Sequence, residues 1–256
     1  MTTAAQMRDR TALVTGGSTG IGAATAAALA RHGAHLVLVA RDAGQLETTA
    51  EGIRDRYGVT VTTIVLDLGA VGGVSTLLDR LDRDGTEIEV LVSNAGMSAA
   101  GRVTATDPST LRRLVDLNAG ALTELTAAVV TRMVARGHGS IVTIASTGAF
   151  APAPVLAAYA ASKAYVLSFT QALWAETAAS GVRVVAVSPG PTETPMNAGR
   201  RRGKRQPEQV ARTVLAALDG SGPSVVDGWL NRVTATLLRL LPTRASTALA
   251  LRVLER

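Results

Sequence analysis

Short apolar runs alternate along this chain with longer stretches in which apolar residues recur at helical spacing. Continuous apolar runs of a few residues predict strands buried on both faces, and the helical spacing predicts amphipathic helices. The predicted strands lie at residues 11–17, 35–41, 59–68, 88–96, 139–146, 182–190 and, as a shorter seventh, 223–228. The predicted helices lie at residues 20–33, 43–58, 69–84, 107–136, 157–180 and 207–219.

The order of these elements predicts the fold class. Strands that alternate with helices form a parallel sheet with helices on both faces. No Pro/Ser-rich linker, internal repeat or low-complexity segment divides the chain. We therefore expect one doubly wound α/β domain over residues 10–228, with a parallel sheet of about seven strands, preceded by a flexible N-terminus at residues 1–9.

The remaining stretch, 229–256, has a different pattern. Trp229, Val233, Leu237 and Leu240 recur near helical spacing, and Pro242 interrupts the pattern. Two amphipathic helices are predicted. Such helices can cover the sheet, form a subunit interface or lie on a membrane surface. We favour packing on the domain or at a subunit interface.

Composition narrows the class of protein. Of the 256 residues 47% are hydrophobic but only 3% aromatic, so a sizeable core must consist of Ala, Val and Leu. The absence of cysteine excludes disulfides and thiolate metal sites. His32, His35 and His138 are scattered and no carboxylate pair stands out, so no metal is expected. An N-terminus without an apolar leader, and no uninterrupted apolar run of membrane length, predict a cytoplasmic protein without a membrane span.

The net charge of +6 is unevenly distributed. Residues 1–199 carry a net charge of −1, and the last 57 residues carry +7. The stretch "RRRGKR" contains Arg200, Arg201, Arg202, Lys204 and Arg205. It is either a mobile, solvated loop or a docking site for an anionic carrier, such as acyl carrier protein, coenzyme A or a cofactor phosphate. Without interleaved aromatic residues, it does not indicate nucleic-acid binding.

A glycine-rich stretch, "TGGSTGIG" at residues 15–22, joins the first predicted strand to the first helix. Glycines permit a tight turn and a close approach of backbone to ligand, and the helix N-terminus suits a pyrophosphate. In this position the motif predicts a dinucleotide site of the Rossmann type. The residues expected to bind the cofactor here are Gly16, Ser18, Thr19, Gly20, Ile21 and Gly22.

The end of the second strand indicates which dinucleotide binds. An NAD site usually has an acidic residue there for the ribose hydroxyl. This chain has Ala40 followed by Arg41. A guanidinium is well suited to a phosphate, so NADP(H) is expected, with Arg41 at its 2′-phosphate.

Lysine is rare in this chain, since only Lys163 and Lys204 are Lys among 26 basic residues. Lys163 follows Tyr159, one of only three tyrosines, by four residues within a predicted helix. Positions i and i+4 lie on one helix face, so the two side chains are expected to be neighbours.

These motifs together resemble the short-chain dehydrogenase/reductase family in its single-domain branch. The matching pieces are "TGGSTGIG", "DL" at 67–68, "SNAG" at 93–96, "LN" at 117–118, Ser146, "YAASK" at 159–163 and "PGPTET" at 189–194. The segments "VLVARDAGQLE" and "GHGSIVTIASTGAFAPAP" are most similar to the NADPH-dependent ketone and 3-ketoacyl reductases of the family. The resemblance implies hydride transfer between nicotinamide C4 and a ketone or secondary alcohol carbon.

The resemblance also implies roles for four residues. Tyr159 would be the acid/base, with a pKa that the cation of Lys163 lowers. Lys163 would also bond the nicotinamide ribose, Ser146 would hold the substrate oxygen, and Asn118 would anchor a water that links Lys163 to solvent. The further cofactor contacts it implies are Asp67, Leu68, Asn94, Ala95, Gly96, Tyr159, Lys163, Pro189, Gly190, Thr192 and Thr194. Ser93 departs from the family, which usually has Asn there.

The substrate pocket implied by the resemblance has small, apolar walls that fit a hydrophobic ketone. Its expected residues are Met97, Ser98, Thr147, Phe150, Leu156 and Met196. The family often assembles through its two long helices, so a homodimer or homotetramer through 107–136 and 157–180 is expected. The alternatives are a non-catalytic NADP(H)-sensing or scaffold protein on the same fold, and an oxidative NAD(P)-dependent alcohol or steroid dehydrogenase.

Overall fold

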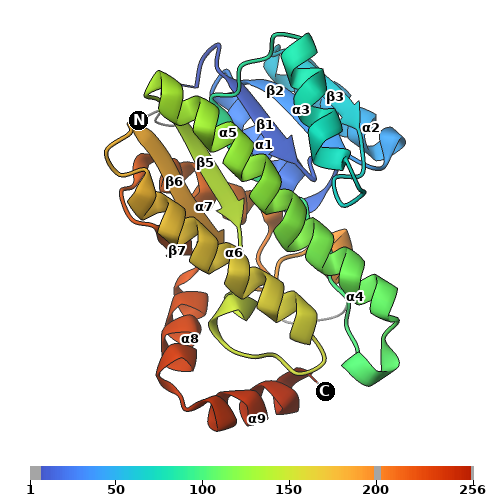
Figure 1. Ribbon diagram of the computed structural model, residues 1–256, viewed down its shortest axis with the longest axis vertical. Helices are drawn as coiled ribbons and strands as arrows, with labels where there is room; N and C mark the ends of the chain where they lie inside the picture. The colour runs from blue at the N-terminus through green and yellow to red at the C-terminus, as the bar shows by residue number, and fades with distance from the viewer. Residues whose placement is uncertain (1–6, 199–202, 255–256) are drawn as a thin grey trace.

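The computed structural model describes residues 7–198 and 203–254 and contains one parallel sheet of seven strands (Figure 1). The strand order is β3-β2-β1-β4-β5-β6-β7. The order reverses between β1 and β4, and in open sheets of this kind ligands bind at the carboxyl ends of the strands beside such a reversal. The strands are β1 (Thr11–Thr15), β2 (His35–Ala40), β3 (Val61–Val65), β4 (Val90–Ser93), β5 (Gly139–Ile144), β6 (Val182–Ser188) and β7 (Ser224–Val226).

Helices cover both faces of the sheet, as Figure 1 shows with α5 and α6 in front of the strands and α1 and α7 behind them. The helices are α1 (Gly20–Arg31), α2 (Ala43–Tyr57), α3 (Gly73–Arg83), α4 (Pro108–Val115), α5 (Leu122–Arg136), α6 (Ala157–Glu176), α7 (Pro207–Asp219), α8 (Trp229–Leu240) and α9 (Thr243–Leu254). Short 3₁₀ turns lie at Val103–Ala105, Thr147–Phe150 and Pro195–Asn197. The doubly wound α/β class predicted from the sequence is confirmed.

Alternate residues of each strand enter two separate cores. Val14 and Leu38 pack with α1, α2 and α7, whereas Leu13 and Leu91 pack with α3 and α5. Because both faces of the central strands are covered, these strands have continuous apolar sequences. This is the pattern that identified them.

The strands are shorter than their apolar runs. The first was expected to reach residue 17 but ends at Thr15, because Gly16 has a φ of +66° and turns the chain out of the extended conformation. The fourth was expected at 88–96, yet β4 covers only Val90–Ser93. Their ends leave the sheet at the edge where the glycine loop lies.

The long helix expected at 107–136 is continuous but not uniform. A π-helical segment, Asp116–Ala121, separates α4 from α5. By length and composition the stretch Pro108–Arg136 could cross a membrane, but half of its most apolar window is buried within the protein. Leu125 and Met133 face the sheet core, as the residues of a core helix do.

The N-terminal boundary of the domain differs from the expected one, whereas the tail begins where it was expected. Residues 1–6 of the segment predicted to be flexible lie outside the described residues, while Met7 is fully buried and packs in the core with α1. The tail does form two helices interrupted at Pro242, as predicted. It packs through α8 against β7 and the turn Thr147–Phe150.

Candidate active site

The glycine loop lies at the carboxyl end of β1. At three of its glycines, neighbouring atoms leave no room for a side chain. A β-carbon at Gly16 would lie 2.8 Å from Nδ2 of Asn94, and one at Gly22 would collide with the carbonyl oxygen of Gly16. At Gly20, φ is +56° and a β-carbon would come within 2.9 Å of the Thr194 methyl group. Because these positions carry no side chain, a ligand can approach the backbone of the loop closely.

The helix that follows the loop is free to bind an anion. Thr19, at the N-cap of α1, makes no side-chain capping bond, and the first turn contains no acidic residue. The first N–H groups of a helix have no intrahelical partners and bear partial positive charge. The bare loop and the uncapped helix together fit the pyrophosphate of a dinucleotide.

A hydrogen-bond network ties this loop to the end of β4. Oγ1 of Thr15 accepts from the backbone N–H groups of Asn94 and Ala95, at 3.0 and 2.9 Å. Nδ2 of Asn94 donates to the carbonyl oxygens of Thr15 and Gly16. Asn94 thus fixes the shape of the loop, a role that the sequence analysis did not assign to it.

Arg41 and Asp67, which follow neighbouring strands, face each other across the edge of the loop. Their closest charged atoms are 3.7 Å apart, and both side chains are well exposed. Oδ1 of Asp67 also accepts from the N–H of Gly69. An exposed pair at this distance contributes little, so Arg41 can leave Asp67 for a stronger anion.

Ser146 and Tyr159 meet at the end of β5. The Ser146 side chain caps the turn Thr147–Phe150, because its Oγ accepts from the N–H of Gly148 at 3.0 Å. Burial raises the pKa of Tyr159, and its hydrogen bond with Ser146 partly opposes that rise. A β-carbon at Gly148 would touch both side chains, so glycine there leaves the tyrosine accessible.

Lys163 lies one helical turn beyond Tyr159 and is buried. Its Nζ donates to the carbonyl oxygen of Ile144 at 2.8 Å, and a β-carbon at Gly96 would lie 3.5 Å from Nζ. Burial lowers the pKa of this amine to about 8. Burial dominates the pKa of Tyr159 here and the Lys163 amine is bonded to Ile144, so a lowering of the Tyr159 pKa by Lys163 stays a prediction.

Asn118 is fully buried in the π-helical segment. Its Oδ1 accepts from the N–H of Met97 at 2.8 Å, and its Nδ2 donates to the Met97 carbonyl and to Oγ of Ser162. A β-carbon at Gly96 would lie 3.1 Å from Oδ1 of Asn118 and 3.5 Å from Nζ of Lys163. The backbone of Gly96 therefore lies beside both side chains. Ser162 was missed in the sequence analysis, although it directly precedes Lys163.

The buried amine predicts a pH-dependent cost to stability. Because the unfolded chain holds the Lys163 proton up to a pH of about 10.5, its ordinary pKa, and the folded chain only up to about 8, the ammonium lowers the free energy of unfolding by about 3 kcal/mol at pH 7. Lys163→Met removes this cost and one hydrogen bond worth about 1 kcal/mol. We expect the variant to be about 2 kcal/mol more stable at pH 7 in urea unfolding.

The pH dependence separates this cause from packing. Between about pH 8 and 10.5 the unfolded state binds the extra proton, so the wild type gains stability with rising pH and the difference between the proteins shrinks. Leu167→Met, on the same helix, carries no titratable group and should follow the pH dependence of the wild type. A difference that stays constant across this range would contradict the assignment.

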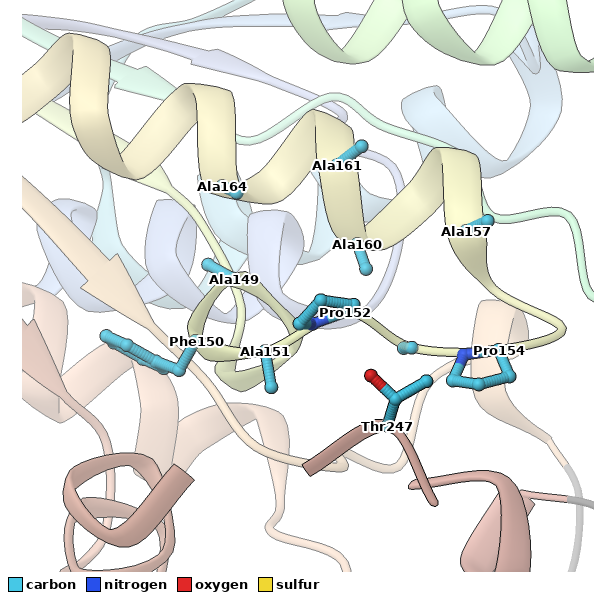
Figure 2. Close-up of a pocket in the computed structure, with 11 residues that line it drawn as sticks. Ala149, Phe150, Ala151, Pro152, Pro154, Ala157, Ala160, Ala161, Ala164 and Thr247 are labelled. Atoms are coloured by element: carbon cyan, nitrogen blue, oxygen red, sulfur yellow. The ribbon is translucent and has the colours of Figure 1, made fainter. Parts of the chain in front are cut away.

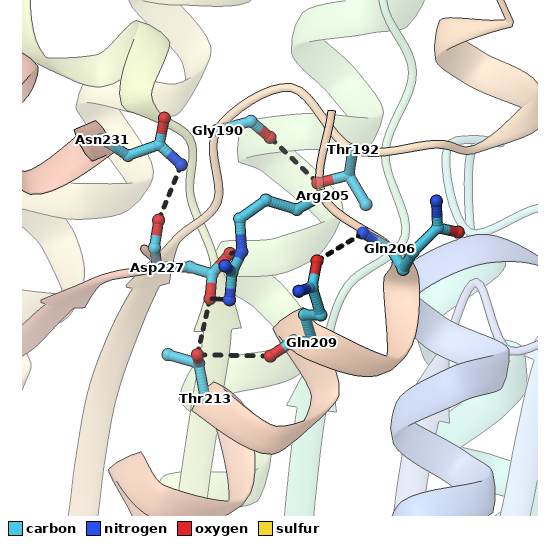
Figure 3. Close-up of polar contacts among 8 residues, drawn as sticks. All are labelled: Gly190, Thr192, Arg205, Gln206, Gln209, Thr213, Asp227 and Asn231. Atoms are coloured by element: carbon cyan, nitrogen blue, oxygen red, sulfur yellow. Dashed lines mark hydrogen bonds and ion pairs between the residues drawn. The ribbon is translucent and has the colours of Figure 1, made fainter. Parts of the chain in front are cut away.

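The segment after β6 lies against the glycine loop, where a β-carbon at Gly20 would come within 2.9 Å of Thr194. Polar contacts clamp this segment at its base (Figure 3). Thr192 and Arg205 form an isolated parallel β-bridge, and the N–H of Glu193 donates to the carbonyl oxygen of Arg205 at 2.9 Å. The Arg205 guanidinium lies 2.6 Å from Oδ2 of Asp227, whose side chain is fully buried and whose Oδ1 also accepts from Thr213. We call this set, Arg205, Asp227 and Thr213, the clamp.

The clamp bears on two of the five cations of the basic stretch, for which docking of a carrier stays a prediction. Arg205 is paired with Asp227, and Lys204 pairs with Glu193 at 3.2 Å with only 5% of its side chain exposed. Neither cation is free to receive a carrier. Arg200, Arg201 and Arg202 lie outside the described residues.

An apolar cavity of about 520 Å³ opens between α6, the loop after Ser146 and α9 (Figure 2). Its walls are Ala149, Phe150, Ala151, Pro152, Ala153, Pro154, Ala157, Ala160, Ala161, Ala164 and Thr247. Of the six expected pocket residues, Phe150 alone lines it. Met97 packs in the core, Met196 is 55% exposed, and Ser98, Thr147 and Leu156 are not among its walls.

The other residues expected at the cofactor lie along the same edge. Pro189 accepts from the N–H of Thr147, and Oγ1 of Thr192 donates to the carbonyl oxygen of Gly190 at 2.9 Å. Leu68 is buried in the core beside Asp67. Ser18, next in the glycine loop, accepts from Thr49 of α2 at 2.8 Å.

A cluster of possible metal ligands lies at the opposite end of the strands. Glu87, Glu89 and His138 bring ligand atoms within 4.8 Å of one another. Arg10 is 2.9 Å from Glu89 and Arg136 is 3.4 Å from Glu87. Two guanidinium groups already neutralise these carboxylates, so the cluster is interpreted as an ion-pair network.

Comparison with known proteins agrees with this geometry. Residues 10–205 match the family model described as short chain dehydrogenase. The chain is 34% identical to an uncharacterized oxidoreductase of Staphylococcus saprophyticus, over 90% of this chain and 97% of that protein. A short-chain dehydrogenase from Sphingobium yanoikuyae in complex with NADPH is 33% identical, with a TM-score of 0.81, over 91% of this chain and 96% of that one. The bulky-bulky ketone specific alcohol dehydrogenase from Comamonas testosteroni is also 33% identical, with a TM-score of 0.78, over 91% and 95% of the two chains.

Proposed function

The chain belongs to the short-chain dehydrogenase/reductase family and is an oxidoreductase, and from that premise we propose that it is an NADP(H)-dependent ketone reductase. When bound, the nicotinamide supplies the hydride that passes to the carbonyl carbon. The substrate is a hydrophobic ketone, and the product is the secondary alcohol. The chain itself must hold the ketone oxygen, deliver a proton to it and bind the cofactor phosphates.

The meeting of Ser146, Tyr159 and Lys163 is the observation that carries this proposal. These residues come from the end of β5 and from one face of α6, and they lie at the sheet edge that also holds the glycine loop. A ketone oxygen placed beside Tyr159 would accept hydrogen bonds from the Tyr159 and Ser146 hydroxyl groups. Both donors stabilise the negative charge that develops on that oxygen.

The protonated form of Tyr159 is the form that reduction of a ketone uses. Burial raises the pKa of its phenol, so Tyr159 is protonated at neutral pH and ready to donate. Reduction needs a proton at the oxygen, whereas oxidation of an alcohol needs the phenolate to remove one.

Lys163 and Asn118 would supply the next proton. With a pKa of about 8, the Lys163 amine can both hold and release a proton near neutral pH. The amide N–H groups of Asn118 are bonded to Met97 and Ser162, which leaves one lone pair of its Oδ1 for a water. Such a water, between Asn118 and Lys163, would connect the amine to solvent.

A free, apolar ketone is the substrate class that the surroundings support best. The loop that follows Ser146 supplies Ala and Pro residues with Phe150 to an apolar cavity whose walls include neither Ser146 nor Tyr159. A relative of known structure is specific for bulky-bulky ketones. We do not extend the proposal to a carrier-bound substrate, because Lys204 and Arg205 are paired within the protein. The test is NADPH consumption with a panel of aryl and long-chain ketones and their acyl thioester counterparts. A lack of turnover with every ketone would refute a reductase.

Cofactor preference should depend on Arg41. Arg41→Ala removes the cation nearest the expected 2′-phosphate, so we expect KM for NADPH to rise by about ten- to one-hundred-fold, the worth of one charged hydrogen bond. KM for NADH, which lacks this phosphate, should change little. Arg80→Ala is the matched control, because Arg80 is also exposed and paired with an acid, Asp84. Equal changes for both cofactors would remove Arg41 from the phosphate site.

A further inference from the structure

Helix α8 leaves an apolar face open to solvent. Six of its large apolar side chains are exposed, with fractions from 40% at the C-cap Leu241 to 77% at Leu240. We call this set the outer face of α8, and it consists of Trp229, Leu230, Val233, Leu237, Leu240 and Leu241. Monomeric proteins rarely expose so continuous an apolar patch without a partner.

Within residues 7–198 and 203–254 the outer face is left uncovered, because α8 is anchored through its other side. Ala235 is buried, Nδ2 of Asn231 donates to the carbonyl of Asp227 at 2.7 Å, and Arg239 stacks over the Phe150 ring at 4.5 Å. Figure 1 shows α8 and α9 as an arm at one end of the molecule, beyond β7. The outer face therefore stays available to a partner.

The charges of the arm select the kind of partner. From Trp229 to Leu254 the chain has Arg232, Arg239, Arg244 and Arg252 but no Asp or Glu. Arg232 and Arg244 are exposed. A second copy packed symmetrically on this face would bring arginines near arginines, which disfavours self-association. An anionic surface complements both the apolar stripe and the charge.

A helix of this length has one way to meet a bilayer. Twelve residues span about 18 Å, which is too short for a hydrocarbon core of about 30 Å. A helix with Trp and Leu on one side and Arg as its only charged residues instead lies in the interface plane. We propose that the outer face of α8 docks this protein onto anionic phospholipid membranes.

Vesicle flotation tests the proposal with the full chain. We expect the wild type to float with phosphatidylcholine vesicles that contain phosphatidylglycerol, and to remain unbound with phosphatidylcholine alone. Val233→Glu with Leu237→Glu should weaken the partition constant at least about ten-fold, because each side chain loses its burial in lipid. Arg232→Gln with Arg244→Gln should weaken it about five-fold per charge, and added salt should do the same.

Matched controls separate this surface from general stickiness. Val71→Glu with Val134→Glu changes two exposed valines outside the arm and should float like the wild type. All variants change exposed side chains, and thermal unfolding checks that they fold. The proposal is overturned if the wild type does not float, if Val233→Glu with Leu237→Glu floats undiminished, or if the control pair loses binding. A wild type that stays unbound, and that light scattering shows to lose a subunit contact on Val233→Glu with Leu237→Glu, would assign the face to a second copy instead.

Discussion

Replacing Tyr159 by phenylalanine should lower kcat by about three orders of magnitude while the protein still binds NADPH. The substitution removes one hydroxyl, which is hydrogen-bonded to Ser146 and held protonated by burial. Loss of a positioned general acid typically costs about 10²–10⁴-fold in rate. Among the described residues, no hydrogen bond joins this hydroxyl to the glycine loop or to α1, which would hold the cofactor.

The measurement is ketone-dependent NADPH consumption at saturating cofactor, with a separate fluorescence titration of NADPH binding. Tyr165→Phe is the control, because Tyr165 lies on the same helix and its hydroxyl is hydrogen-bonded to Thr123 at 2.8 Å. It should retain nearly full turnover. A Tyr159→Phe variant with more than a tenth of wild-type kcat would show that another group protonates the ketone.

Replacing Lys163 by arginine should be nearly as damaging, although the charge is kept. The side chain is 5% exposed, Nζ is bonded to the carbonyl oxygen of Ile144, and Gly96 is so near that a β-carbon there would lie 3.5 Å from Nζ. A guanidinium is larger and planar, and it cannot release a proton near neutral pH. We expect kcat/KM to fall by about 10²–10³-fold, with a loss of stability because this charge cannot be neutralised on burial.

Lys204→Arg makes the same exchange at the only other lysine. Its Nζ pairs with Glu193, and a guanidinium can replace that ion pair, so a change of at most a few-fold is expected. Initial rates and urea unfolding of both variants give the comparison. Wild-type activity in Lys163→Arg would mean that a fixed positive charge suffices and that the titratable amine has no part in the reaction.

The periodicity of the sequence was sufficient to predict the sheet and its helices, because buried parallel strands and amphipathic helices have different patterns. It also placed Tyr159 and Lys163 on one helix face by spacing alone. The bond from Lys163 to Ile144 and the raised pKa of Tyr159 were out of reach, since both depend on how deeply α6 packs against β5. Burial and long-range partners are not local properties of a sequence.

The basic stretch also depends on partners that are distant in sequence. "RRRGKR" reads as a run of exposed charges because its counter-ions are distant in sequence. Asp227, which pairs with Arg205, follows it by 22 residues and is fully buried, and the clamp forms only when β7 and α7 pack. The composition gives the excess of positive charge, but not the acidic partners of Lys204 and Arg205.

The π-helical segment at Asp116–Ala121 has a consequence at the level of the gene. A π turn closes its hydrogen bonds one residue further along the chain than an α turn, so it behaves as a one-residue insertion in a helix. Removing one codon there would let the helix close regularly, with α4 and α5 keeping the faces they now present, because the π turn already absorbs the extra residue. Asn118 would then leave Met97 and Ser162, although every bonding side chain was still encoded. In this stretch the number of residues matters to the site as much as their identity.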